Sequence, residues 1–108
     1  AQEIPPLREG AREMRTAHRL DVGHAAMSQA FEGLGWTVVD LSGAGNGVPD
    51  VLIGHRRHGA FLIEFKSTNG RLRQSQIDFI QDWPRQIYVV RSVDDVVDVH
   101  NQLTRGRK

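Results

Sequence analysis

The chain has 108 residues, of which 39% are hydrophobic and 25% charged, and its net charge is +1. This length fits one domain with a single core, and the composition is that of a globular protein and not of a disordered chain. The absence of cysteine excludes disulfides and thiolate zinc sites. No apolar run approaches the ~20 residues that are needed to cross a bilayer.

The first third of the chain predicts a helix and then a strand. From about residue 13 the sequence favours helix, and its apolar side chains recur at three- and four-residue spacing at Met27, Ala30, Phe31 and Leu34. Gly35 ends this helix. Residues 36–41 are aromatic and β-branched and predict a strand, which a glycine-rich loop at 42–47 follows.

The middle of the chain predicts a β-hairpin. Apolar runs at 51–53 and 60–63 flank a polar turn at 55–59, and a glycine stands near each end of this turn. Asp50 precedes the first strand, and Glu64 lies inside the second.

Three ionisable side chains, Asp50, Glu64 and Lys66, accompany this hairpin. Successive side chains of a strand point to opposite faces, so Glu64 and Lys66 share a face. An acid and a base on a half-buried face are costly to desolvate unless they pair or bind something. One interpretation is a surface ion pair on an edge strand. The other is a site in which the two carboxylates share a divalent cation and the lysine binds a substrate anion or water.

The remaining residues alternate between helix and strand. Residues 74–83 show helical apolar spacing, and residues 86–91 predict a further strand. Ser92 and Asp95 resemble a capping box that opens a last helix.

The predicted elements follow the order α-β-β-β-α-β-α. This order predicts an α/β fold in which a mixed β-sheet is flanked by helices. We expect a flexible N-terminal arm at 1–12, a single domain at 13–104 and a basic tail at 105–108.

Basic side chains are unevenly distributed although the net charge is small. The candidate nucleic-acid contacts are the cationic or titratable residues in the middle of the chain, Arg56, Arg57, His58, Arg71 and Arg73. A nucleic-acid partner needs a local basic surface and not a high total charge, because binding releases counterions at the contact. The alternative is an ordinary solvated face.

The spacing of Pro49-Asp50 and Glu64-Phe65-Lys66 matches the PD-(D/E)XK nuclease pattern. The wider sequence resembles the VRR-NUC branch (virus-type replication-repair nuclease) of that superfamily. The resemblance extends from about His24 to Leu103 and includes Gly47-Val48 before the first acid, the Gly70-Arg71-Leu72 segment and Gln76. These additions make it far more specific than the three-residue pattern alone.

The resemblance implies a restriction-endonuclease-like core and a site that hydrolyses phosphodiester bonds with Mg²⁺ or Mn²⁺. By this resemblance the cation ligands are Asp50, Glu64 and the main-chain carbonyl of Phe65. Lys66 would position the attacking water or stabilise developing charge, and Gln76 would reach toward water or substrate.

Relatives carry a first-helix glutamate that completes the metal site. Here His24 stands at about that position, and Asp21, one turn earlier, is the alternative. Both depart from the family pattern.

The resemblance further implies a cytoplasmic homodimer that cuts branched DNA, such as Holliday junctions, without contacting membranes. Two alternatives stay open: a non-catalytic DNA-binding module on the same fold, and a sequence-specific restriction endonuclease.

Overall fold

The computed structural model describes residues 22–105, so the predicted arm, Asp21 and residues 106–108 lie outside the described part of the chain. The elements follow the predicted order and are α2 (Val22–Gly33), β1 (Thr37–Asp40), β2 (Val51–His55), β3 (Gly59–Phe65), α3 (Gln74–Asp82), β4 (Tyr88–Val90) and α4 (Val93–Arg105). The last helix extends to Arg105, one residue into the predicted basic tail. Among residues 22–105, no helix is long and apolar enough to cross a membrane.

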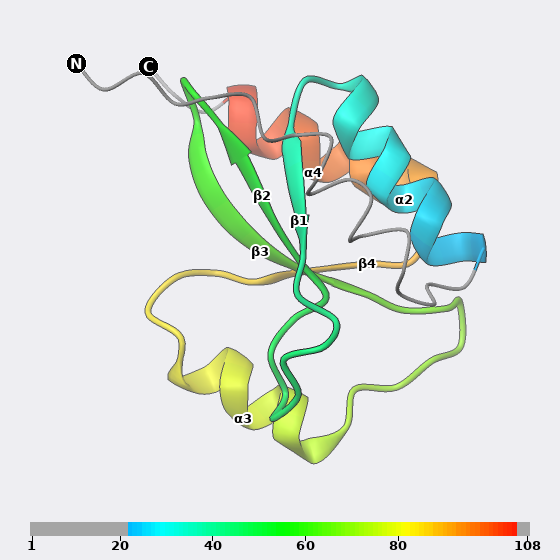
Figure 1. Cartoon of the computed structure of the whole chain (residues 1–108), viewed down its shortest axis with the longest axis vertical. Coiled ribbons are helices and arrows are strands. Elements are labelled where there is room, and N and C mark those ends of the chain that lie inside the picture. The colour runs from blue at the N-terminus through cyan, green and yellow to red at the C-terminus, as the bar shows by residue number, and fades with distance from the viewer. Residues whose placement is uncertain (1–21, 106–108) are drawn as a thin grey trace.

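The predicted mixed sheet flanked by helices is confirmed. Within residues 22–105 the sheet has four strands in the order β1-β2-β3-β4. The first three strands are antiparallel, whereas β3 and β4 are parallel. A parallel pair needs a crossover connection, which α3 provides. Figure 1 shows α3 on one face of the sheet and both α2 and α4 on the other.

The predicted hairpin forms from β2 and β3. Its register pairs Val51 with Ile63 at the open end and His55 with Gly59 at the turn. Gly59 has a φ of +93°, a left-handed conformation that residues with a Cβ rarely adopt. This turn therefore fixes the register, and one step beyond the last pair the same register places Asp50 opposite Glu64.

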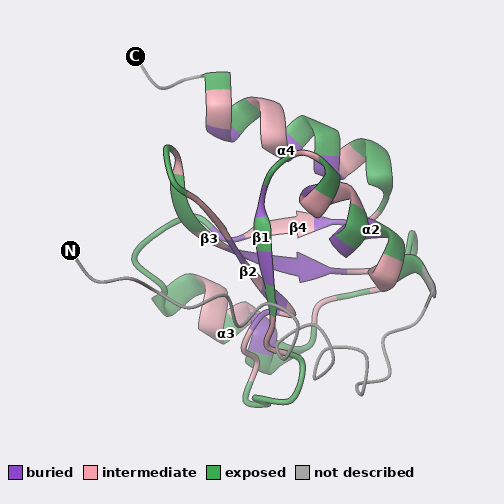
Figure 2. Ribbon diagram, turned by 45° about the horizontal axis from the view of Figure 1, so that its top comes forward, coloured by how far each residue is buried: buried purple, intermediate pink, exposed green. Residues whose placement is uncertain are grey.

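The main hydrophobic core lies between the sheet and the helices α2 and α4. Its largest fully buried side chains include Phe31 from α2, Ile53 and Phe65 from the hairpin, and Val96 from α4. Figure 2 shows the end of β3 in the colour of buried residues. The predicted apolar stripe on the first helix therefore faces this core.

The opposite face of the sheet carries α3 and buries polar as well as apolar side chains. Glu64 and Gln76 are both buried there, while Trp83, just after α3, is 42% exposed. A glycine positions this helix: Gly47 has a φ of +81°, and a Cβ on it would lie 2.2 Å from the main-chain oxygen of Ser75. The glycine-rich loop thus closes directly on the first turn of α3.

Candidate active site

A pocket of about 420 Å³ opens at the end of the hairpin where β2 begins and β3 ends. Its lining includes every predicted catalytic residue, the candidate ligand on the first helix and two of the predicted phosphate contacts: Asp50, Glu64, Lys66, Gln76, His24, Arg71 and Arg73. Segments from α2, the hairpin and the start of α3 therefore meet at one site.

Asp50 is held against the neighbouring strand. The main-chain N–H of Phe65 donates a hydrogen bond of 2.8 Å to Asp50 Oδ2. The main-chain oxygen of Asp50 accepts from Leu41 N–H at 2.7 Å, which ties the residue to the end of β1 as well. The carboxylate is therefore fixed beside Glu64 by backbone contacts.

Glu64 is the buried acid of the site, with a side chain only 4% exposed. Its Oε2 lies 3.4 Å from Lys66 Nζ and accepts a hydrogen bond of 2.8 Å from Gln76 Nε2. Burial, and after it the negative charge of Asp50, raises the pKa of Glu64 from 4.5 to about 7. Lys66 and Arg73 oppose this rise without cancelling it.

Gln76 supports Glu64 from the first turn of α3. Its Oε1 accepts the main-chain N–H of Arg73 at 2.8 Å, while its Nε2 donates to Glu64. The amide is therefore oriented by both of its ends, and it caps the helix as it holds the acid. The role that the resemblance implied for Gln76, a contact with water or substrate, stays a prediction, and in the structure the side chain contacts Glu64.

Lys66 follows β3 directly, and its side chain is 15% exposed. Its main-chain N–H donates to Val90 O at 2.9 Å, so the residue continues the pairing with β4. The ammonium group pairs with Glu64 and borders the pocket. The predicted neighbourhood of acid and base on one strand face is thus present, and it is buried more deeply than a surface ion pair.

His24 lines the pocket from α2, and its ring packs against Phe65 with a centroid separation of 5.4 Å. Among residues 22–105, no group of three or more His, Asp or Glu side chains is arranged to hold a metal ion. His24 therefore lies at the pocket, and its part in a metal site stays a prediction. Its alternative, Asp21, lies outside the described residues.

The donor chemistry of the pocket nevertheless fits a divalent cation. Asp50 and Glu64 place two carboxylates together, and their repulsion contributes to the raised pKa of Glu64. A divalent cation would relieve this repulsion, and carboxylate oxygens are ligands that suit Mg²⁺ or Mn²⁺. Phe65, whose carbonyl the resemblance adds to the ligands, also lines the pocket.

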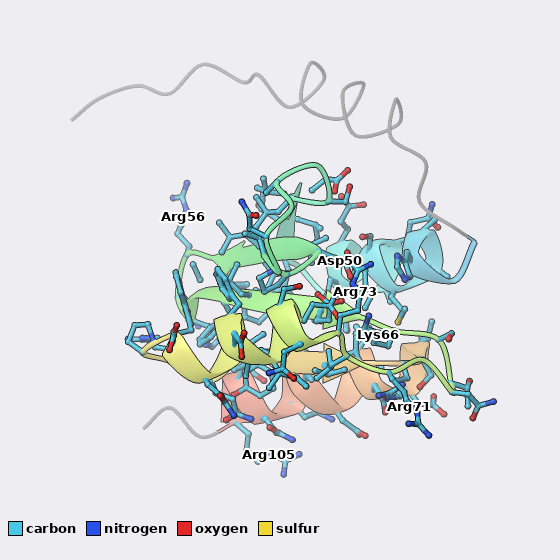
Figure 3. All side chains as sticks on the ribbon, turned by 90° about the horizontal axis from the view of Figure 1, so that it is seen from below. Asp50, Arg56, Lys66, Arg71, Arg73 and Arg105 are labelled. Atoms are coloured by element: carbon cyan, nitrogen blue, oxygen red, sulfur yellow. The ribbon has the colours of Figure 1, made fainter. Side chains whose placement is uncertain are left out.

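The predicted DNA contacts fall into two groups. Arg71 and Arg73 line the pocket, whereas Arg56, Arg57 and His58 form the turn of the hairpin. The turn is separated from the pocket by the length of β2, which is roughly 15 Å at the usual rise per residue. Figure 3 shows Arg56 at the far end of the hairpin from Asp50, Lys66 and Arg73.

The sequence patterns did not identify two residues of the pocket lining as site residues. These are Ser67 and Gly70, which lie in the loop after β3. Arg91, which binds this loop, was also missed. For Gly70 the residue type was a usable signal, because a glycine in a loop can mark a close approach of another group. A Cβ at this position would lie 2.9 Å from Ser67 Oγ. Nothing local to the sequence indicated Arg91, since it lies more than 20 positions away from its partners.

A family model described as the VRR-NUC domain matches residues 8–94, which is most of the chain and includes all residues that line the pocket, from His24 to Gln76. The chain belongs to the VRR-NUC family. No curated protein and no solved structure matched the chain significantly. Membership in the VRR-NUC family gives the chain a nuclease-type function that acts on DNA.

Proposed function

We propose that this VRR-NUC domain is a metal-dependent endonuclease that hydrolyses phosphodiester bonds in DNA. The observation that carries the proposal is the convergence of Asp50, Glu64 and Lys66 in one open pocket. The hairpin register and the Phe65 hydrogen bond fix both acids. A surface ion pair does not account for a glutamate that is buried beside a second carboxylate.

The cation would be Mg²⁺ or Mn²⁺, held by Asp50, Glu64 and the carbonyl of Phe65. When bound, such a cation neutralises phosphate charge and lowers the pKa of water. The chain supplies the remaining functions. The ammonium group of Lys66 stabilises negative charge at the scissile phosphate, and Gln76 keeps Glu64 oriented toward the pocket.

Two arginines extend the site along a DNA strand. Arg71 and Arg73 border the pocket and would bind phosphates that flank the scissile one. The basic turn at 56–58 would contact DNA farther away. Because so small a domain offers little surface for reading bases, we propose selectivity for branched DNA by a homodimer, whose two-fold symmetry presents two sites to two strands.

One observation favours a second candidate, a DNA-binding module without turnover. In the described part of the chain, no group of three or more acid or imidazole side chains is arranged to hold a metal ion, although His24 lines the same pocket as Asp50 and Glu64. Such a module would bind DNA in a salt-sensitive manner but would not cut it.

A cleavage assay separates these functions. Four-way junction, flap, single-stranded and linear duplex DNA are incubated with the chain in Mg²⁺ and in Mn²⁺. We expect cleavage of the junction, and a loss of at least about 100-fold in Asp50→Ala and in Lys66→Ala. The matched control is Arg105→Ala, an exposed arginine on α4 away from the pocket.

The results discriminate among the functions. Cleavage that survives both substitutions would overturn the proposed site, and binding without turnover in either metal would establish the non-catalytic module. Cutting of linear duplex at one sequence would instead establish a restriction endonuclease. Titration calorimetry with Mn²⁺ provides a second readout, since Asp50→Ala is expected to lose the binding heat.

A further inference from the structure

The loop that joins β3 to α3 carries much of the pocket lining but has little regular structure of its own. Ser67 and Gly70 line the pocket, and Arg71 and Arg73 follow directly. A turn closed by the hydrogen bond from Gly70 N–H to Ser67 O, at 3.1 Å, shapes the segment. Ordering such a loop costs conformational entropy, so contacts from elsewhere in the fold are needed to hold it.

Arg91 makes these contacts from the position directly after β4, the strand that pairs with β3. Its Nη1 lies 2.8 Å from the main-chain oxygen of Ser67, 2.6 Å from that of Gly70 and 3.4 Å from that of Thr68. All three acceptors are carbonyls of the pocket loop. A charged donor strengthens such hydrogen bonds, and the converging carbonyl dipoles favour a cation at this point.

The position of Arg91 is itself fixed by two elements. It follows β4, whose Val90 accepts the N–H of Lys66. Its own N–H donates to Asp95 Oδ2 at 2.8 Å, while Asp95 N–H donates to Ser92 Oγ at 3.1 Å in the first turn of α4. The predicted capping pair at the start of α4 thus also anchors Arg91.

We propose that Arg91 is a positioning residue of the active site, which holds loop 67–70 and thereby places the phosphate contacts Arg71 and Arg73. The role rests on the proposed function, because it acts through residues that bind DNA. The metal-binding acids are held by hydrogen bonds in which Arg91 takes no part: Phe65 N–H donates to Asp50, and Gln76 donates to Glu64. Loss of the contacts between Arg91 and loop 67–70, which we call the clamp, therefore lowers the affinity for DNA more than the rate of the chemical step.

The geometry selects the variants for a test. Because a single nitrogen makes all three contacts, the ammonium group of Arg91→Lys, with three hydrogens, is suited to replace it. Arg91→Met has an unbranched apolar side chain but no donor. Arg105→Met is the matched control, since Arg105 is an exposed arginine in the last turn of α4.

Hydrogen exchange on the full chain measures the loop directly. In Arg91→Met we expect the amides of Gly70 and Arg73, which donate hydrogen bonds within this segment, to exchange at least about 10-fold faster, with those of β2 and β3 unchanged. Arg91→Lys and Arg105→Met are expected to exchange like the wild type. The Kd for a labelled four-way junction in EDTA and the KM for its cleavage should rise about 10-fold in Arg91→Met, with kcat within about 3-fold.

Loop exchange that stays unchanged in Arg91→Met would overturn the proposal. So would a fall in kcat without a rise in KM, or an Arg91→Lys variant as impaired as Arg91→Met. If Arg91→Met does not fold, Arg91→Gln, which retains an amide donor, is judged by the same criteria. A wild type that never cuts DNA would overturn the proposed function, while the exchange and DNA-binding measurements would still decide on the clamp.

Discussion

The two faces of the sheet differ in what they bury. The face toward α2 and α4 is apolar, with Phe31, Ile53 and Phe65 in its interior. The face toward α3 buries Glu64 and Gln76 in a hydrogen-bonded pair and leaves Trp83 exposed at the end of the helix. The apolar face thus supplies most of the stability of the fold. The α3 face is stabilised less, because it buries the polar side chains that form the site.

The apolar face should respond most strongly to truncation. Phe31→Ala removes a fully buried ring and is expected to lower the free energy of unfolding by about 3–5 kcal/mol. Ile77→Ala, at a half-buried position on α3, should cost about 1–2 kcal/mol. Urea unfolding of both variants measures the contrast, and equal losses would contradict the division between the faces.

The site face should make stability depend on pH. Between pH 4.5 and about 7, Glu64 holds a proton in the folded chain that the unfolded chain has released. Without metal, the contribution of Glu64 to the free energy of unfolding is therefore largest below pH 4.5 and falls as the pH rises to about 7, by up to about 3 kcal/mol.

The matched variant for this prediction is Glu64→Gln, which removes the titration but keeps the shape. In EDTA, the free energy of unfolding of the wild type should fall relative to this variant as the pH rises from 4.5 to 7. Mn²⁺ should then raise the Tm of the wild type alone, because a ligand stabilises the state that it binds. Parallel pH profiles for the two proteins would refute the assignment of the pKa to Glu64.

Gln76 links the two roles of the α3 face. Gln76→Ala loses both the contact with Arg73 N–H and the hydrogen bond to Glu64, and should cost about 1–2 kcal/mol of stability. Gln76→Glu restores the helix cap but places a further carboxylate, in addition to Asp50, against Glu64. If the residue acts through Glu64, thermal unfolding at pH 8 will show the glutamate variant to be less stable than the alanine variant. The reverse order would assign Gln76 to capping alone.

The smallest expected effect is a difference in DNA affinity between variants of the pocket arginines and variants of the hairpin turn at 56–58. Arg73→Ala should weaken DNA binding and reduce the slope of log Kd against log salt by about 1, as expected for the loss of one phosphate contact. Arg56→Ala, at the far turn, should change the affinity less, because this turn lies away from the pocket. Fluorescence anisotropy at several salt concentrations measures the Kd of both variants. A larger loss of affinity in Arg56→Ala would indicate that DNA binds closer to the hairpin turn than to the pocket.

Local sequence patterns predicted much of the fold. Alternation in the hairpin and the glycine at its turn set the register, and the register places Asp50 opposite Glu64. Strand ends were less predictable: β4 spans only Tyr88–Val90, within the predicted 86–91, because its pairing partner β3 ends at Phe65. The prediction of DNA contacts treated arginines that are close in sequence as one group, although a strand separates them in space.

The sequence by itself determined the order of the elements and the acids and lysine of the pocket, because strand periodicity and hairpin register act over a few residues. The tertiary structure alone decided the orientation of the Gln76 amide, the burial that raises the pKa of Glu64, and the contact of Arg91 with the pocket loop. These features depend on where the crossover through α3 returns the chain to the sheet. No local pattern encodes that position, since it results from the packing of helices on both faces.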